Sequence, residues 1–335
     1  MKKRNIYKSY RLILLLFIIF ILIGCKKGSQ KPDISKKGNI PKLPKVLEEL
    51  EDETLKIMYD LDSVPGIEKA IEEEKALKAK QTASVKTIAI PIGQWQLGKN
   101  IGGKELKIAK GSKSKQTEEK VDMQELITES EIIIPLLKAQ EVKGTFAKSK
   151  TPPPDIETVW SKISDNAMMI HKKWNVLEAQ LPIEKTSQEK INEFEKILDD
   201  LTISIIDKKR LGGLTQANEL TRVTAGLRNH FDGMGNSDVF EMYYHTRGVI
   251  LSAAIDDYAG AINHLNETTK IGDSMRQDLV KKGSKDVLKK FELSTEDLGD
   301  QLVDENFQLS QIKAPIVIKN IKLIQDAFET KKQSR

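Results

Sequence analysis

The chain has 335 residues, of which 54 are basic and 49 acidic, and it contains one cysteine, Cys25. Residues 1–24 carry five of the basic residues and no acidic residue, so the rest of the chain holds 49 of each sign and is formally neutral. This balance excludes a basic nucleic-acid footprint as a global property, and we expect no nucleic acid among the partners. A single cysteine excludes a disulfide framework and a cysteine-based zinc site.

The first 24 residues have the pattern of a secretory signal peptide. A basic start leads into twelve uninterrupted apolar residues, Leu12–Ile23. Twelve helical residues span roughly 18 Å, whereas the hydrocarbon core of a membrane is about 30 Å thick, so the length disfavours an uncleaved membrane anchor. A basic region followed by a short apolar region is typical of a segment that is removed on export. We therefore predict that residues 1–24 are a signal peptide.

The end of this segment, Leu22-Ile23-Gly24-Cys25, resembles the lipobox of bacterial lipoproteins. In that family the chain is cut just before the cysteine, and the thiol is diacylated. The resemblance thus implies acyl chains, such as palmitate, on Cys25, and two chains are enough for stable anchoring. The Lys- and Ile-rich usage resembles that of low-GC Gram-positive bacteria. The expected location is the extracytoplasmic face of the cell membrane, with the membrane itself as one partner.

Residues 25–154 are expected to form a long, partly disordered tether that contains short helical segments. Up to residue 158 this part of the mature chain has only three aromatic residues, Tyr59, Trp95 and Phe146, and it is rich in Lys, Glu, Ser and Gly. A segment so poor in large apolar groups buries too little area to offset the entropy of an ordered chain.

Two short helices are predicted within this tether. Apolar residues recur at helical spacing through Val46–Leu61, and Pro65 begins a second helical run that reaches Lys80. Both runs are dense in charge, and we interpret them as solvated helices. The stiff sequence Thr151–Pro154 marks the expected boundary of the tether.

From Asp155 onward the pattern predicts an all-α fold, a helical bundle. Apolar residues step by three or four along three helices in residues 155–234, the first unit. A shift of 97 residues repeats the second and third of these helices in residues 235–335, the second unit. The pairs include Phe194 with Phe291, Leu201 with Leu298, Ile205 with Leu302, Ala217 with Ala314, and Leu227 with Ile324.

For the first helix of each unit, a shift of 88 pairs Ile163 with Leu251 and Trp174 with Ile262. The predicted architecture is therefore two tandem three-helix units packed as one bundle. Chance helical phasing would account for many of these matches.

Three phrases in the helical region carry a second resemblance: Val159–Ile163, His171–Glu178 and Ala217–Thr221. Through them, residues 155–330 resemble a group of uncharacterised extracytoplasmic lipoproteins of low-GC Gram-positive bacteria. The resemblance implies a helical-bundle fold and no particular activity.

The four histidines are His171, His230, His245 and His264. Metal-binding bundles use the spacings HxxxH and ExxH, and neither is present. We therefore predict no metal site and no cofactor. The alternative, an iron- or haem-binding bundle, requires at least two of these histidines to converge from different helices.

Aromatic residues near the start of the second unit give the candidate interaction patch, Phe240, Tyr243 and Tyr244, because aromatic side chains are enriched in the cores of interfaces. Asn218 aligns with Pro315, so the third helices are where the two units are most expected to differ in function. No nucleophile–base pair is evident, and we predict no enzymatic activity. The expected function is a binding or scaffolding module with a cell-envelope protein as partner, the alternative being a ligand- or metal-binding bundle.

Overall fold

The computed structural model describes residues 42–87, 123, 127, 131–147, 149, 151–181, 186–231 and 237–329. The predicted signal peptide and Cys25 lie outside these residues. The described helices are α2 (Lys45–Thr87), α4 (Ile134–Ala139), α5 (Ile156–Glu178), α6 (Gln188–Ile206), α7 (Arg210–Arg228), α8 (Ser237–Ala253), α9 (Tyr258–Ser274), α10 (Arg276–Lys281), α11 (Lys285–Val303) and α12 (Phe307–Glu329). No strand occurs among these residues, so the predicted all-α bundle is confirmed.

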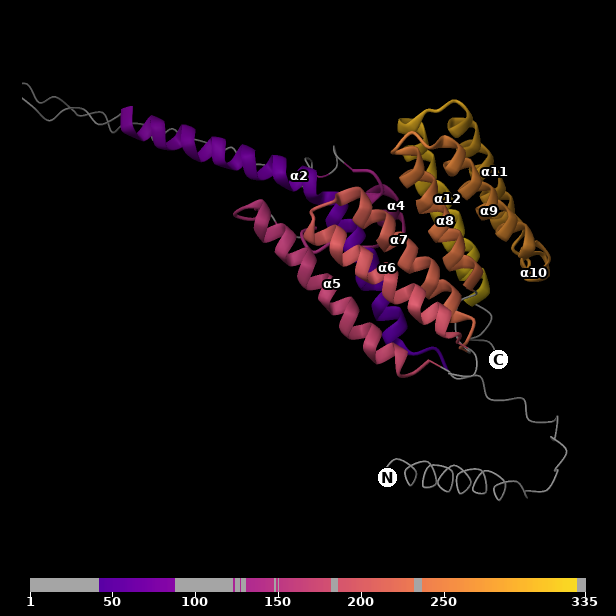
Figure 1. Cartoon of the computed structure of the whole chain (residues 1–335). Coiled ribbons are helices and arrows are strands. Elements are labelled where there is room, and N and C mark those ends of the chain that lie inside the picture. Colours follow the sequence, from indigo (N-terminus) through magenta and orange to yellow (C-terminus); the bar gives the residue numbers. More distant parts are fainter. Residues whose placement is uncertain are drawn as a thin grey trace, which may run out of the picture. The chain divides into compact units, whose positions relative to one another are not determined.

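The long helices group into two units that have the same packing order (Figure 1). In the first unit, α2, α5, α6 and α7 each pack against the next helix, and α7 returns to pack against α2. In the second unit, α8, α9, α11 and α12 repeat this closed order. Each predicted three-helix unit thus gains a fourth helix, α2 in the first and α8 in the second. The units meet where α7 packs against α8.

The 97-residue shift agrees with the helix bounds. It carries both ends of α6 onto those of α11, and the start of α7 onto the start of α12. Both α6 and α11 end in the same turn, with a residue of positive φ at equivalent positions, Lys208 (φ 56°) and Glu305 (φ 52°). In each turn the next amide donates to a carbonyl five residues back, which closes the helix end. These parallels support duplication of a four-helix unit.

The shift of 88 residues for the first helix is wrong. It pairs residues of the single helix α5 with Leu251 on α8 and Ile262 on α9, and a turn over residues 254–257 separates those two helices. The chain order makes α9 the counterpart of α5. In that turn the Asp257 carboxylate accepts from the amide of Gly260 at 2.9 Å and caps α9.

Helix α2 corrects the expectation of short, solvated helices in the tether. The two predicted runs form one helix that continues through Pro65. Leu47, Leu50, Ile57 and Leu61 are fully buried, and α2 packs along α5 and α7. The bundle therefore begins well before residues 151–154. Only the end of α2 after Ile71 has no buried residue among those described, and Figure 1 shows it extending past the other helices.

Two buried carboxylates on α2 hold the segment that follows it in the structure. Asp62 accepts hydrogen bonds from the amides of Ile132, Ile133 and Ile134 at 2.7–2.9 Å, which caps the start of α4. Its other oxygen pairs with Arg210 at 3.0 Å. Burial raises the pKa of Asp62, whereas Arg210 and the three amides lower it.

The second carboxylate, Asp60, accepts from the amide and hydroxyl of Thr145 at 2.6 and 2.5 Å, and from Asn166 on α5 at 3.1 Å. Burial raises the pKa of Asp60 to about 6. Asp60 and Asp62 together fix residues 131–147 between α2 and α12.

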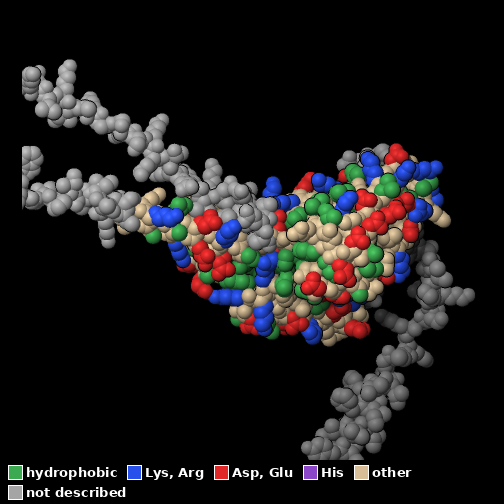
Figure 2. Space-filling model, turned by 90° about the horizontal axis from the view of Figure 1, so that it is seen from above, with side chains coloured by type: hydrophobic (Ala, Val, Ile, Leu, Met, Phe, Trp, Pro, Cys, Tyr) green, Lys and Arg blue, Asp and Glu red, His purple; other side chains and the backbone are tan. Residues whose placement is uncertain are grey.

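The surface of the bundle carries charges of both signs. Figure 2 shows acidic and basic side chains intermixed over the face that it displays, with no area of one sign dominating it. Among the described helices, none combines the length and apolarity needed to cross a membrane.

The burial of α2 predicts a loss of stability that a solvated helix would not show. We expect Leu50→Ala to lower the free energy of unfolding by about 2–5 kcal/mol, since it leaves a cavity in the core. Leu77→Ala, the same change on the exposed end of α2, serves as the matched control and should cost far less. Urea unfolding followed by tryptophan fluorescence measures both, and equal costs would contradict the packing of α2.

Candidate functional site

A cleft of about 640 Å³ lies at the junction of the two units. Helices α2, α7, α8 and α12 form its walls together with residues 140–143, which follow α4. Its lining combines acidic, basic, amide and aromatic side chains: Glu48, Glu51, Asp52, Glu53, Leu55, Lys56, Gln140, Glu141, Val142, Lys143, Thr221, Arg228, Phe240, Tyr243, Arg247, Lys322 and Gln325. We call this space the junction cleft. Its volume is within the range of clefts that hold small ligands.

The first charged pair of the junction cleft joins α2 to α7. Arg228 donates from Nε to Oε1 of Glu51 at 2.9 Å and from Nη2 to Oε2, so the pair is bidentate. Both side chains are buried. Burial raises the pKa of Glu51, and its contact with Arg228 opposes that rise. The guanidinium also lies over the ring of Phe240, 3.6 Å from its centroid.

The second buried cation, Arg247 on α8, binds neutral acceptors only. Its Nε donates to Oδ1 of Asn218 at 2.8 Å, one Nη to Oγ1 of Thr221 at 2.7 Å, and the other to Oε1 of Gln140 at 2.8 Å. Arg247 is 2% exposed. Burial lowers the pKa of Arg247 to about 10, so the side chain stays charged at neutral pH. Among the described residues, no carboxylate forms an ion pair with it.

The predicted interaction patch is not an exposed aromatic surface. Tyr243 and Tyr244 are each 6% exposed, because α8 packs against α7, α9 and α12 and has little free surface. Phe240 is half-buried beneath Arg228. Phe240 and Tyr243 nevertheless line the junction cleft, and the Tyr243 hydroxyl donates to Gln325 on α12 at 3.2 Å. The predicted position is thus close to the site, whereas the predicted exposure is wrong.

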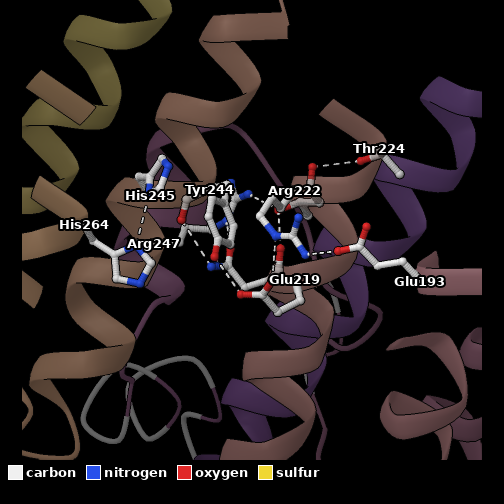
Figure 3. Close-up of polar contacts among 10 residues, drawn as sticks. Glu193, Glu219, Arg222, Thr224, Tyr244, His245, Arg247 and His264 are labelled. Carbon is white, nitrogen blue, oxygen red and sulfur yellow. Dashed lines mark hydrogen bonds and ion pairs between the residues drawn. The ribbon is translucent and has the colours of Figure 1, made fainter. Parts of the chain in front are cut away.

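Two of the four histidines converge. Nδ1 of His245 on α8 lies 3.0 Å from Nδ1 of His264 on α9, and Figure 3 shows the two rings facing each other beside Tyr244. The His264 ring lies against Gly248, where a Cβ would come within 2.7 Å of it. His171 instead contacts Thr202 on α6 at 2.9 Å.

The fourth histidine, His230, directly follows the C-cap of α7. Burial is the main cause that lowers the pKa of His245 to about 4, and His264 adds to it; burial also lowers the pKa of His264. Both rings are therefore neutral at neutral pH, and one donates its Nδ1 proton to the other. No group of three or more His, Cys, Asp or Glu side chains in the described part of the chain is placed to hold a metal ion.

Beside the histidine pair, whose rings contact the Tyr244 ring edge-on, a polar network joins Tyr244 to the first unit (Figure 3). The Tyr244 hydroxyl donates to Glu219 on α7 at 2.6 Å. Arg222 donates to Glu219 at 2.8 Å and to Glu193 on α6 at 2.6 Å. Asn218 also donates to the carbonyl of Tyr244 at 3.2 Å, so one amide contacts α8 at both Tyr244 and Arg247. The network joins α6, α7 and α8 across the junction.

Sequence reasoning pointed to Asn218 but missed Arg247, Arg228, Glu51 and Gln140. One signal was available, since Arg247 is a lone cation in the otherwise uncharged segment 242–255 of the sequence. The partners of Arg247 come from chain positions far apart, which periodicity does not reveal.

Comparison of the chain with protein-family models, with curated proteins and with solved structures gives no match.

The histidine pair predicts a loss of stability in acid. A base whose pKa is lower in the folded state than its unfolded value of about 6.5 takes up protons preferentially on unfolding. The contribution of His245 to the free energy of unfolding should therefore fall as the pH drops from 7 toward 5. Asp60 acts in the opposite direction, but equally in every variant compared.

Urea unfolding at both pH values measures this effect. His245→Gln should lose less stability between pH 7 and pH 5 than the unsubstituted chain, whereas His171→Gln, the control, should retain the full loss. An identical pH dependence in all three proteins would contradict the buried pair.

Proposed function

We propose that this chain is a lipid-anchored binding protein of the extracytoplasmic face of the cell membrane, and that it holds its ligand in the junction cleft. The lipobox resemblance at Leu22–Cys25 supports the anchor. One observation carries the binding proposal: a cleft of about 640 Å³ with charged side chains buried in its floor.

The polar floor distinguishes the junction cleft from a gap between helices. Burying a charged side chain is costly, and a fold that needed only stability would fill this place with apolar residues. Glu51, Arg228 and Arg247 instead place three charges beneath a solvent-connected space. Buried charges that line a cleft are characteristic of binding and catalytic sites.

The cleft walls also support binding rather than a purely structural role. Four helices and residues 140–143 contribute side chains, and they come from both units. Ligand sites often form at such boundaries between units, because convergent groups can be supplied from both sides. A scaffolding role for the outer surface of the bundle is compatible with this proposal.

Solute capture tests the proposal. The full-length chain, extracted from membranes in mild detergent, is incubated with the low-molecular-weight fraction of growth medium and washed, and the retained solutes are identified by mass spectrometry. We expect one solute class to be retained by the unsubstituted protein and lost from Val142→Trp, which fills the cleft with an indole.

The intact mass of the same protein should show acyl chains, absent from Cys25→Ala.

Val303→Trp is the matched control, because Val303 is 73% exposed and lies outside the cleft. It should retain the solute. Retention of no solute by the unsubstituted protein, or equal retention by both tryptophan variants, would contradict binding in the junction cleft.

The convergence of His245 and His264 favours a second candidate function, the binding of a transition metal or haem. Neutral imidazoles are the form that metals bind, and the two Nδ1 atoms are 3.0 Å apart. Metal analysis of protein purified without a histidine tag tests it. Stoichiometric metal that is lost in His264→Gln and kept in His171→Gln would support this candidate, whereas substoichiometric metal would contradict it.

A further inference from the structure

The floor of the junction cleft holds more buried positive than negative charge. Arg228 and Arg247 are both buried, but the only buried carboxylate of the described cleft lining is that of Glu51. Both carboxylate oxygens of Glu51 accept hydrogen bonds from Arg228. Arg247 is therefore left with neutral acceptors, although it lines the same space. A buried guanidinium in this state would be stabilised by an anion that enters the cleft.

We propose that the junction cleft binds a small zwitterion, an amino acid or a short peptide, with its carboxylate on Arg247 and its ammonium group toward Glu48 and Asp52. This inference rests on the proposed function, whose ligand class it specifies. The position of the carboxylate follows from the uncompensated charge of Arg247. The position of the ammonium group follows from Glu48 and Asp52, which lie at the rim of the cleft.

Gln140 marks the place where the carboxylate binds. Its Oε1 accepts from Nη1 of Arg247, and it is the partner of Arg247 that comes from outside α7 and α8. Gln140 is half-buried at the end of α4, whereas Asn218 and Thr221 are buried. A carboxylate that displaces the Gln140 amide replaces a neutral acceptor with an ionised one, so that both partners of the hydrogen bond are charged.

The rim of the cleft selects against ligands with several negative charges. Glu141 pairs with Lys322 at 2.7 Å and Glu53 with Lys56 at 3.5 Å, so these charges are compensated. Glu48, Asp52 and Lys143 line the cleft, are exposed, and form no ion pair with the described residues, so two unpaired carboxylates stand against one unpaired ammonium group.

Partial desolvation at the cleft wall and the neighbouring Glu53 raise the pKa of Asp52, and an added cation would stabilise its charged form. A ligand with an ammonium group and a carboxylate can pair with Glu48 and Asp52 through the first group and with Arg247 through the second.

Thermal unfolding of the full-length chain with defined peptide pools tests the inference. The probes are a pool of random tripeptides with free carboxylates, the same pool with amidated C-termini, and citrate. We expect the free-acid pool to raise the midpoint of unfolding, because a ligand that binds the folded state stabilises it. The amidated pool and citrate should give little or no shift.

Variants at the contact sharpen the test. Arg247→Lys keeps the positive charge but loses the planar pair of N–H donors that matches a carboxylate. It should weaken binding of the free-acid peptides about tenfold. Gln140→Ala removes the competing acceptor without touching the buried floor, and it should strengthen binding severalfold. Gln308→Ala, an exposed glutamine outside the cleft, should leave binding unchanged. Since Arg247 is buried, Gln140→Ala keeps the test decisive if Arg247→Lys does not fold.

Equal shifts with the free-acid and amidated pools would overturn the carboxylate contact, and so would a weaker response of Gln140→Ala. A larger shift with citrate than with peptides would overturn the zwitterion. The absence of any shift would overturn the inference as a whole. If solute capture still retained another ligand that Val142→Trp loses, the proposed function would stand without this ligand class.

Discussion

The guanidinium of Arg247 connects α8 to α7 and to the end of α4, the elements that meet at the junction cleft. It extends from α8, binds Asn218 and Thr221 on α7, and reaches Gln140 at the end of α4. Its three partners come from two elements outside its own helix, and the buried groups of Asn218 and Thr221 would lose a hydrogen-bond donor without it. The contact between the two four-helix units is therefore polar at its centre, although apolar packing of α7 against α8 surrounds it. Removing Arg247 would take a hydrogen-bond donor from all three acceptors at once, so their contributions are not independent.

The position of Gln140 depends in turn on the two aspartates of α2. Asp62 caps α4, and Asp60 holds Thr145 on the far side of the loop. Since Gln140 lies between these two points in the chain, both ends of the loop that walls the cleft are fixed to α2. Helix α2 also supplies Glu51, the partner of Arg228. Helix α2 thus supplies the buried carboxylate of the cleft floor and positions residues 140–143 in the cleft wall. Its burial is therefore required for the site as well as for the fold.

Much of the fold was accessible from the sequence, because helical periodicity is a local signal. The stripes of α5, α6 and α7 and the 97-residue repeat all depend on residues a few positions apart. The helical spacing of Val46–Leu61 was also visible, but the high charge density of this run favoured a solvated helix, so its burial was missed. The site was harder still, since Glu51 and Arg228 are separated by 177 positions and no local pattern records such a pairing.

Comparison of the two units shows how the site depends on divergence of a duplicated helix. The 97-residue shift places Asn218, Thr221 and Arg228 of α7 opposite Pro315, Ile318 and Gln325 of α12. The three residues of α7 are buried polar or charged side chains, whereas Ile318 of α12 is a fully buried part of the apolar core. Gln325 nevertheless lines the same cleft and accepts from Tyr243, so the equivalent helices face each other across it with different chemistry. A symmetric pair would have placed either two polar floors or none at the junction. The asymmetry leaves one of the two buried guanidinium groups, that of Arg247, without a carboxylate partner among the described residues, and that is the condition under which one small anionic group can bind with a defined orientation.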